Sequence, residues 1–235
     1  MSLPLSESFL SFQGEGPRAG RLSHFIRLGG CNLSCGFAGG WKCDSGYTWD
    51  SRSYKLSDEM TPRSPAEIVA TVDGECDDVI ITGGEPLIHQ RNPDWAVLLR
   101  ELSKRRKFIA VETNGTIAPT VETRTFVRHY SVSPKLSNTQ HKPGQSAVMV
   151  DWPERLKFDE ACLKFVVASP EDVREAVSIS DAHGWPRSNV WMMPEGTDSA
   201  RLRESFLAIA RETIEQRVNI SHRLQILAFG DMKGT

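Results

Sequence analysis

The sequence predicts a single α/β domain, built either as a wound parallel sheet or as an open βα barrel. Short runs rich in Val, Ile and Phe alternate with longer amphipathic runs along the chain. Several apolar runs lack inside–outside alternation, which is typical of strands buried on both faces of a parallel sheet. The chain has 235 residues with no internal repeat or low-complexity linker, so we expect one domain over residues 1–235.

The expected strands and helices follow one another as βα units. The strands are expected at 24–28, 79–82, 108–112, 130–133, 163–167, 190–193 and 224–227. The helices are expected at 64–72, 94–106, 170–183 and 199–216, the first with Pro65 in its first turn. Two long connections, 36–65 and 131–151, interrupt this rhythm. Long loops in compact α/β proteins are usually functional or mobile, and in barrels those at the carboxyl ends of strands carry the active site.

Charge and hydropathy exclude several functional classes. The formal net charge is −2, and the densest basic stretch, 104–107, ends an expected helix, where it suits the helix dipole. A nucleic-acid-binding protein would show a stronger basic excess, so we expect a small-molecule substrate and no nucleic acid. The chain has no apolar run long enough to span a membrane and no secretory signal at its start, so we expect a cytoplasmic enzyme without membrane contact.

Three of the five cysteines, Cys31, Cys35 and Cys43, lie close together after an apolar strand. An odd cysteine count without an export signal argues against a disulfide framework and favours metal or iron–sulfur ligation. Three thiolates on one loop can hold three irons of a [4Fe–4S] cluster and leave the fourth iron open. A structural zinc site, with a fourth ligand such as His24 or His89, remains the alternative.

A second motif, Thr82-Gly83-Gly84-Glu85-Pro86, directly follows another apolar strand. Glycines after strands are common, so this turn alone would mean little. Together with the cysteine loop it resembles the radical S-adenosylmethionine (SAM) superfamily, in which a C-x3-C-x2-C loop ligates a [4Fe–4S] cluster and a Gly-Gly-Glu-Pro motif binds SAM. The resemblance implies a partial, incomplete βα barrel of the radical SAM type, with the cluster on Cys31, Cys35 and Cys43.

Further motifs narrow the resemblance to one family. They are Ser-Phe-Gln-Gly-Glu-Gly-Pro at 11–17, Phe-Ile-Arg-Leu at 25–28, Cys-Asp-Ser at 43–45, Glu-Thr-Asn-Gly at 112–115, Ser-Pro-Lys at 133–135 and Lys-Phe-Val at 164–166. In this order, from about residue 5 to 167, they look like 7-carboxy-7-deazaguanine synthases of queuosine and 7-deazapurine biosynthesis. The resemblance implies a lyase that converts 6-carboxy-5,6,7,8-tetrahydropterin to 7-carboxy-7-deazaguanine by radical ring contraction, with loss of ammonia.

The family resemblance also implies roles for individual residues. The expected SAM contacts are Gly83, Gly84, Glu85, Thr113, Asn114, Ser133 and Lys135, and the expected substrate contacts are Gln13, Gly14, Glu15, Arg27 and Thr82. Amide and carboxylate groups suit the donor–acceptor edge of a pterin, and an arginine suits a substrate carboxylate, although an internal salt bridge is an equal alternative for Arg27. Ser45 is expected to ligate Mg²⁺, with Asp44 in support.

The cluster loop, about residues 31–50, departs from the family pattern. Seven residues separate Cys35 from Cys43 where the family usually has two, and Ala38 stands at the usual cysteine position. We therefore expect a bulged loop that still uses Cys43, with Phe37 or Trp41 packed near the adenine of SAM. A C-terminal extension, about 218–235, is expected to add a strand at 224–227 that closes the sheet.

The resemblance further implies a homodimer and a flavodoxin-like or ferredoxin-like electron donor. Two other functions stay open. A glycyl-radical activase would share the cluster and SAM motifs but act on a protein partner. A zinc-binding interaction protein would use the cysteines alone.

Overall fold

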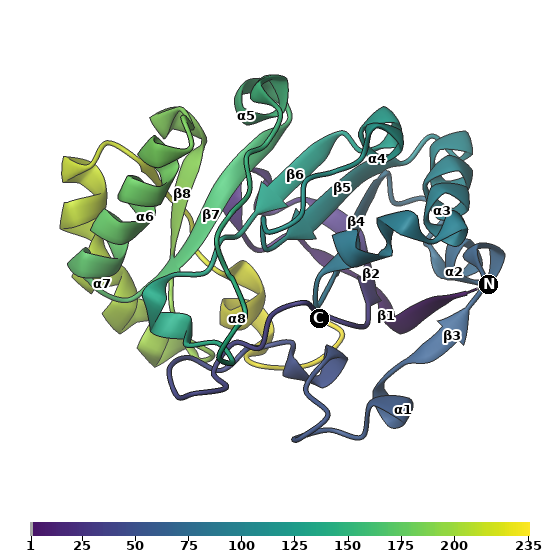
Figure 1. The fold of residues 1–235 in the computed structure, drawn as a ribbon, viewed down its shortest axis with the longest axis horizontal. Helices are drawn as coiled ribbons and strands as arrows, with labels where there is room; N and C mark the ends of the chain where they lie inside the picture. Colours follow the sequence, from purple (N-terminus) through teal and green to yellow (C-terminus); the bar gives the residue numbers. More distant parts are fainter. Residues whose placement is uncertain (1) are drawn as a thin grey trace.

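The computed structural model describes residues 2–235, which form one curved sheet with helices packed along its outer face (Figure 1). In the described chain the sheet has nine strands in the order β3-β1-β2-β4-β5-β6-β7-β8-β9. The strands are β1 Leu3–Phe12, β2 Leu22–Leu28, β3 Thr61–Arg63, β4 Asp78–Gly83, β5 Phe108–Thr113, β6 His129–Val132, β7 Ala161–Val167, β8 Val190–Pro194 and β9 Asn219–Ile220. The α-helices are α1 Leu56–Glu59, α2 Pro65–Thr71, α3 Pro93–Lys104, α4 Val121–Phe126, α5 Glu154–Asp159, α6 Pro170–Ala182, α7 Ser199–Glu215 and α8 Leu224–Phe229. Short 3₁₀ turns lie at Gly16–Arg18, Gly46–Thr48, Pro86–Arg91, Ser137–Thr139 and Arg187–Asn189.

Strand direction places the carboxyl ends of the central strands at one edge of the sheet. The chain from β2 through β4 to β9 pairs in parallel, and only β1 runs antiparallel, between β2 and β3. Helices α3, α4, α5, α6 and α7 lie in successive crossovers between parallel strands. The edge strands of the sheet, β3 and β9, are not hydrogen-bonded to each other in the described chain. The expected incomplete βα barrel is therefore confirmed.

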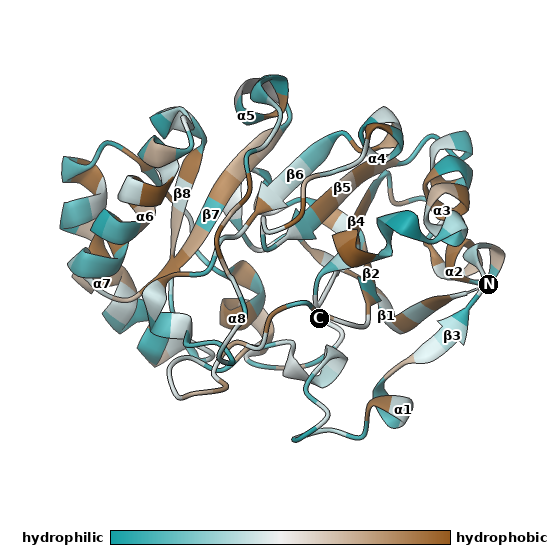
Figure 2. Ribbon diagram, in the orientation of Figure 1, coloured by the Kyte–Doolittle hydropathy of each residue, from teal (hydrophilic) through white to brown (hydrophobic). Residues whose placement is uncertain are grey.

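The main hydrophobic core lies between the sheet and its helices. Ile81 and Val111 on the strands are fully buried together with Leu98 of α3, and brown apolar segments follow the central strands in Figure 2. Removing such a side chain, as in Ile81→Ala, would cost about 2–5 kcal/mol. On the inner face a smaller cluster contains Phe25, with Phe9 stacked on it at a ring-centroid distance of 5.3 Å. The barrel interior is thus filled partly by side chains.

The sequence located most elements, but it misplaced the C-terminal strand. The expected strands from 24–28 to 190–193 and all four expected helices are present, with ends shifted by only a few residues. The segment 224–227, expected as a strand, lies in helix α8, so that prediction is wrong. Three apolar residues around Gln225 carry no clear period, and here Ile226 is buried while Leu227 stays 45% exposed. The strand β1 was also missed, because Ser and Glu interrupt its apolar pattern.

Candidate active site

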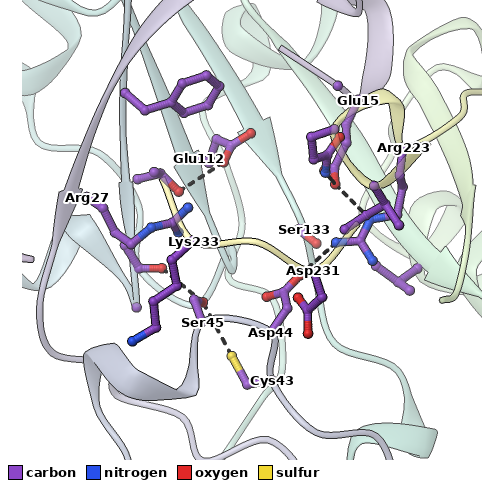
Figure 3. Close-up of a pocket in the computed structure, with 18 of the residues that line it drawn as sticks. Glu15, Arg27, Cys43, Asp44, Ser45, Glu112, Ser133, Arg223, Asp231 and Lys233 are labelled. Atoms are coloured by element: carbon purple, nitrogen blue, oxygen red, sulfur yellow. Dashed lines mark hydrogen bonds and ion pairs between the residues drawn. The ribbon is translucent and has the colours of Figure 1, made fainter. Parts of the chain in front are cut away.

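A cavity of about 250 Å³ opens at the carboxyl ends of the parallel strands (Figure 3). Its wall brings together residues from the start of the chain, the cysteine loop, the inner strands and the C-terminal segment. Among the lining residues are all the expected site residues except Glu85: Gln13, Gly14, Glu15, Arg27, Cys31, Cys35, Cys43, Ser45, Thr82, Gly83, Gly84, Thr113, Asn114, Ser133 and Lys135. Motifs that are far apart in the sequence therefore share one cavity.

The three clustered cysteines all line this cavity as free thiols. Burial raises the pKa of Cys31 to about 12 and that of Cys35 to about 11, so both carry a proton at neutral pH and would lose it on binding a metal centre. Within residues 2–235, no three His, Cys, Asp or Glu side chains are arranged to hold a single metal ion. The compact ligand set of a structural zinc ion is therefore not found in the described chain.

The enlarged cysteine loop rests on the second long connection of the chain. The Gly36 N–H donates to the Thr139 carbonyl at 2.6 Å, and the Trp41 N–H donates to the Asn138 carbonyl at 3.2 Å. A Cβ atom at Gly40 would overlap the same Asn138 carbonyl, which explains the need for glycine there. The seven residues between Cys35 and Cys43 thus form a supported bulge.

Neither expected aromatic of this bulge reaches the cavity. Phe37 lies under the Arg52 guanidinium, 4.2 Å from ring centroid to Cζ, and is 37% exposed. Phe37 and Trp41 are absent from the cavity wall, whereas Tyr47 and Trp49 line it. Phe37 therefore packs on Arg52 rather than on the cavity wall, and the expectation that Phe37 or Trp41 packs near the adenine of SAM stays a prediction.

The glycine pair at the end of β4 allows close contact with the end of β2. A Cβ atom at Gly83 would overlap the Leu28 carbonyl, and one at Gly84 would overlap the Gly30 carbonyl. The Gly84 N–H donates to Leu28 at 3.2 Å, and the Glu85 N–H donates to Gly30 at 2.9 Å. These amides are occupied within the protein, so the carbonyl groups of this turn are what it offers to a ligand.

Glu85 acts behind the cavity wall. Its side chain is fully buried, and its carboxylate accepts hydrogen bonds from the Thr113 hydroxyl, at 2.8 and 2.9 Å, and from the Leu87 N–H at 2.9 Å. The Asn114 N–H donates to it at 2.6 Å. Burial raises the pKa of Glu85 to about 7. The Glu85 carboxylate thus ties the ends of β4 and β5 together, and its expected contact to SAM stays a prediction.

A buried lysine, which the sequence analysis did not assign, joins two carboxylates on the cavity wall. The Lys164 ammonium donates to Glu15 Oε2 at 2.6 Å and to Glu112 Oε1 at 3.2 Å, and its side chain is only 5% exposed. Gln13 Nε2 also donates to Glu112, at 3.1 Å, and the Thr82 hydroxyl donates to it at 2.9 Å. Three of the expected substrate residues, Gln13, Glu15 and Thr82, are thus linked through Glu112 and Lys164.

Arg223, at the start of α8, extends this network to the cysteine loop. It donates to Glu15 Oε1 at 3.0 Å and to Asp44 Oδ2 at 2.7 Å, so the three side chains lie in a row in Figure 3. Gln225 Nε2 donates to Glu15 at 2.7 Å, while its Oε1 atom is buried without a hydrogen-bond partner in the described chain. Burial would raise the pKa of Glu15, but Lys164 and Arg223 hold it well below its ordinary value.

Arg27 is held by an internal ion pair but keeps free donors. Its Nε donates to Glu7 Oε2 at 2.7 Å, and the Tyr47 hydroxyl donates to the same carboxylate at 2.6 Å. Burial would lower the pKa of Arg27, but Tyr47 and Glu7 raise it above the ordinary value. No hydrogen bond from its two Nη groups is found within residues 2–235. The internal salt bridge and a contact to a ligand are therefore compatible.

The mouth of the cavity is lined by the C-terminal segment. Gly230 to Thr235 all contribute to the wall. The Lys233 ammonium pairs with Glu59 at 2.8 Å and lies 4.1 Å from the centroid of the Tyr47 ring. Nearby, the Ser45 hydroxyl makes only long contacts, 3.5 Å to Cys43 Sγ and 3.5 Å to the Gly83 carbonyl. The hydroxyl oxygen of Ser45 therefore remains available to a ligand.

Two of the missed residues had a signal in the sequence. Lys164 is a charged residue in the centre of an apolar strand, and such a lysine is rarely buried unless paired. Glu112 similarly ends an apolar strand. Arg223 had no comparable signal, because its position depends on how the C-terminal segment folds back to Glu15.

Comparisons with known proteins agree with this geometry. Residues 25–126 match the family model of the Radical SAM superfamily. A 7-carboxy-7-deazaguanine synthase of Pyrobaculum aerophilum is 36% identical over 97% of this chain and 95% of its own length. One of Hyperthermus butylicus is 36% identical over 96% and 92%.

A solved structure is similar over nearly the whole chain. The crystal structure of QueE from Escherichia coli matches with a TM-score of 0.67 and 25% identity, covering 94% of each chain. The fold, the shared motifs and this extent of identity lead to one assignment. The chain belongs to the 7-carboxy-7-deazaguanine synthase family of radical SAM enzymes.

Proposed function

We propose that this protein is a 7-carboxy-7-deazaguanine synthase, which converts 6-carboxy-5,6,7,8-tetrahydropterin to 7-carboxy-7-deazaguanine by radical ring contraction with loss of ammonia. The observation that carries the proposal is one cavity lined both by the cysteine loop and glycine turn and by a wall of carboxylate and amide groups. A cluster and SAM alone would need only the first part. The second part offers hydrogen-bond acceptors to a nitrogen-rich ring.

The residues present fit a [4Fe–4S] cluster and SAM. Cys31, Cys35 and Cys43 offer three thiols to one cavity, and a cluster with three protein ligands keeps one iron open. At Gly83 and Gly84 the backbone lies so close to the Leu28 and Gly30 carbonyls that no residue with a side chain would fit. With SAM bound, the reduced cluster would supply the radical chemistry. The protein would bind and orient SAM and the substrate and exclude water from them.

The charged wall fits the substrate ring. Glu15 and Glu112 are acceptor groups held in place by Lys164, and Gln225 Oε1 is a further buried acceptor. A pterin presents adjacent N–H donors along one edge, which these groups can accept. The free Nη groups of Arg27 suit the carboxylate of the substrate as a bidentate donor.

A magnesium ion at Ser45 is part of the proposal. Its hydroxyl oxygen makes only long contacts, and the adjacent Asp44 carboxylate is 52% exposed beside the cavity. Oxygen donors of this kind suit Mg²⁺, which keeps several waters in its shell. Ser45→Thr should keep the dependence of turnover on Mg²⁺, whereas Ser45→Ala should raise the Mg²⁺ concentration needed; an unchanged requirement in Ser45→Ala would remove Ser45 as a ligand.

The enzyme acts on a small molecule and needs a reductant, and we propose a flavodoxin-like or ferredoxin-like protein as the electron donor. The proposal includes a homodimer and a cytoplasmic location, as in the family resemblance. None of the helices in the described chain is both long and apolar enough to span a membrane. Sedimentation at micromolar concentration distinguishes the dimer from a monomer.

The proposal is tested by anaerobic incubation of cluster-reconstituted protein with SAM, Mg²⁺ and a chemical reductant. Either 6-carboxytetrahydropterin or a candidate glycyl-radical protein is supplied as substrate. We expect 5′-deoxyadenosine together with 7-carboxy-7-deazaguanine from the pterin. Cleavage of SAM that depends on the protein partner, with no deazaguanine from the pterin, would favour an activase and refute the proposal.

A further inference from the structure

We propose that Lys164 is a positioning residue for the pterin, whose ammonium keeps Glu15 and Glu112 ionised side by side, so that both accept hydrogen bonds from the N–H edge of the substrate. The inference rests on the proposed function, since it needs a ligand with such an edge. It assigns a task to a residue that would not itself touch the reacting atoms. Lys164 acts through the two carboxylates that line the cavity beside it.

The geometry makes Lys164 the common partner of both acids. Its ammonium lies 2.6 Å from Glu15 Oε2 and 3.2 Å from Glu112 Oε1. Glu15 has a second cation, Arg223, whereas the other donors to Glu112 are the neutral groups of Gln13 and Thr82. Without Lys164, Glu15 would keep Arg223 and Glu112 would keep the charge of the more distant Arg27, but no cation would lie between the two carboxylates.

Two neighbouring carboxylates that lack a shared cation do not both ionise readily. The repulsion raises the pKa of one of them, so that it holds a proton and becomes a hydrogen-bond donor. A protonated acid no longer accepts a bond from a substrate N–H group. In the present structure the opposite holds for Glu15, whose pKa is depressed by Lys164 and Arg223 despite its burial.

Most titratable groups around the network keep their charge in the pH range of the test. Glu85, whose pKa burial raises to about 7, is an exception, but it titrates in wild type and in the variants alike, so the slope is read relative to wild type. Burial, with Arg18 and Lys164, lowers the pKa of His129 to about 4, and burial raises that of Cys162 to about 11. Arg27, Arg223 and Asp44 also face the network, and these three stay charged between pH 6 and 9. A pH-dependent defect on removing Lys164 would therefore come from the carboxylate pair.

The test is equilibrium binding of 6-carboxytetrahydropterin to the reconstituted enzyme with SAM, without reductant, so that no turnover occurs. For Lys164→Met and Lys164→Gln we expect the Kd to rise about tenfold at pH 6 and only about twofold at pH 9, because the pair ionises again as the pH rises. Wild type and Lys164→Arg should show no such slope. In the double variant Lys164→Met/Glu112→Gln the slope should disappear, since only one acid remains.

The matched control is Lys157→Met, which removes another buried lysine. Lys157 lies on α5 outside the cavity, where it donates to the His183 carbonyl at 2.7 Å. We expect Lys157→Met to lower thermal stability without any pH-dependent change in pterin binding. A slope in this variant would show that the effect reports general loosening of the fold, and would overturn the inference.

The outcomes separate the inference from the proposed function. Suppose that wild type binds the pterin. If Lys164→Met and Lys164→Gln then bind it more weakly by the same factor at every pH, or bind it as tightly as wild type, Lys164 has no role in keeping the pair ionised. A slope that persists in the double variant would assign it to another group, such as His129, and would also overturn the inference. If wild type does not bind the pterin at any pH, the proposed function itself fails.

Discussion

The two halves of the cavity wall are formed by different kinds of chemical group. Where β2, β4 and β5 end, the wall is made of backbone and small residues, such as Gly83 and Gly84, that lie close to one another in space because parallel strands end together. On the other side it is made of charged side chains, among them Glu15 and Arg223, which are 208 residues apart. The first half is therefore sensitive to added volume and the second to lost charge.

The largest expected effect is in the cysteine loop. Cys43→Ala should abolish cluster assembly and SAM cleavage, because two thiols cannot replace three in holding the iron. Iron content, the absorbance of the cluster and 5′-deoxyadenosine formation measure this. Cys76→Ala is the control, since Cys76 is buried outside the cavity and should leave all three unchanged. A Cys43→Ala protein with a full cluster would contradict the proposed ligand set.

The next effect tests the backbone half. Gly84→Ala places a Cβ atom against the Gly30 carbonyl and near Cys31 Cβ, so β4 must move away from the start of the cysteine loop. We expect SAM affinity to fall about 100-fold, since each lost interaction there is worth roughly 1–3 kcal/mol. Gly74→Ala is the control, because a Cβ atom at Gly74 would meet no other atom within 4 Å. Equal SAM affinity in both variants would contradict the account.

The third effect tests the charged half. Arg223→Met leaves Glu15 and Asp44 without this cation, and breaking a buried ion pair in this way costs about 3–5 kcal/mol of stability, reduced here because Asp44 is partly exposed. Calorimetry should show weaker pterin binding with SAM binding retained. The control is Arg201→Met, which removes a surface ion pair to Glu195 and should change neither the stability nor the affinity for the pterin. Weakened SAM binding in Arg223→Met would mean that the halves are not separate.

The smallest effect concerns Glu85, which joins β4 to β5. Its pKa of about 7 lies above the ordinary 4.5, so the native state keeps a proton that the unfolded chain releases between these values. The free energy of unfolding should therefore fall as the pH rises from about 4.5 to 7, by about 2 kcal/mol. Glu85→Gln should flatten this slope in urea titrations. An identical slope in Glu85→Gln would mean that another group causes the pH dependence of stability.

The same contrast explains what the sequence could predict. The glycine turn and the cysteines are local motifs after apolar strands, so strand order alone brings them together, and the cavity contains them as expected. Lys164 and Glu112 were recognised only as parts of motifs, because their pairing depends on the register across β5, β6 and β7. Arg223 depends on a C-terminal helix that was expected to be a strand. Local chemistry was predictable, whereas long-range charge pairing was not.

The central claim is that one half of the cavity serves SAM cleavage while the other selects the pterin. It is tested most directly by measuring 5′-deoxyadenosine and 7-carboxy-7-deazaguanine in the same anaerobic reaction for wild type and Arg223→Met. The account predicts both products from wild type, and from Arg223→Met continued SAM cleavage with most of the deazaguanine lost at limiting pterin. Equal loss of both products, or deazaguanine formation unaffected by the substitution, would contradict it.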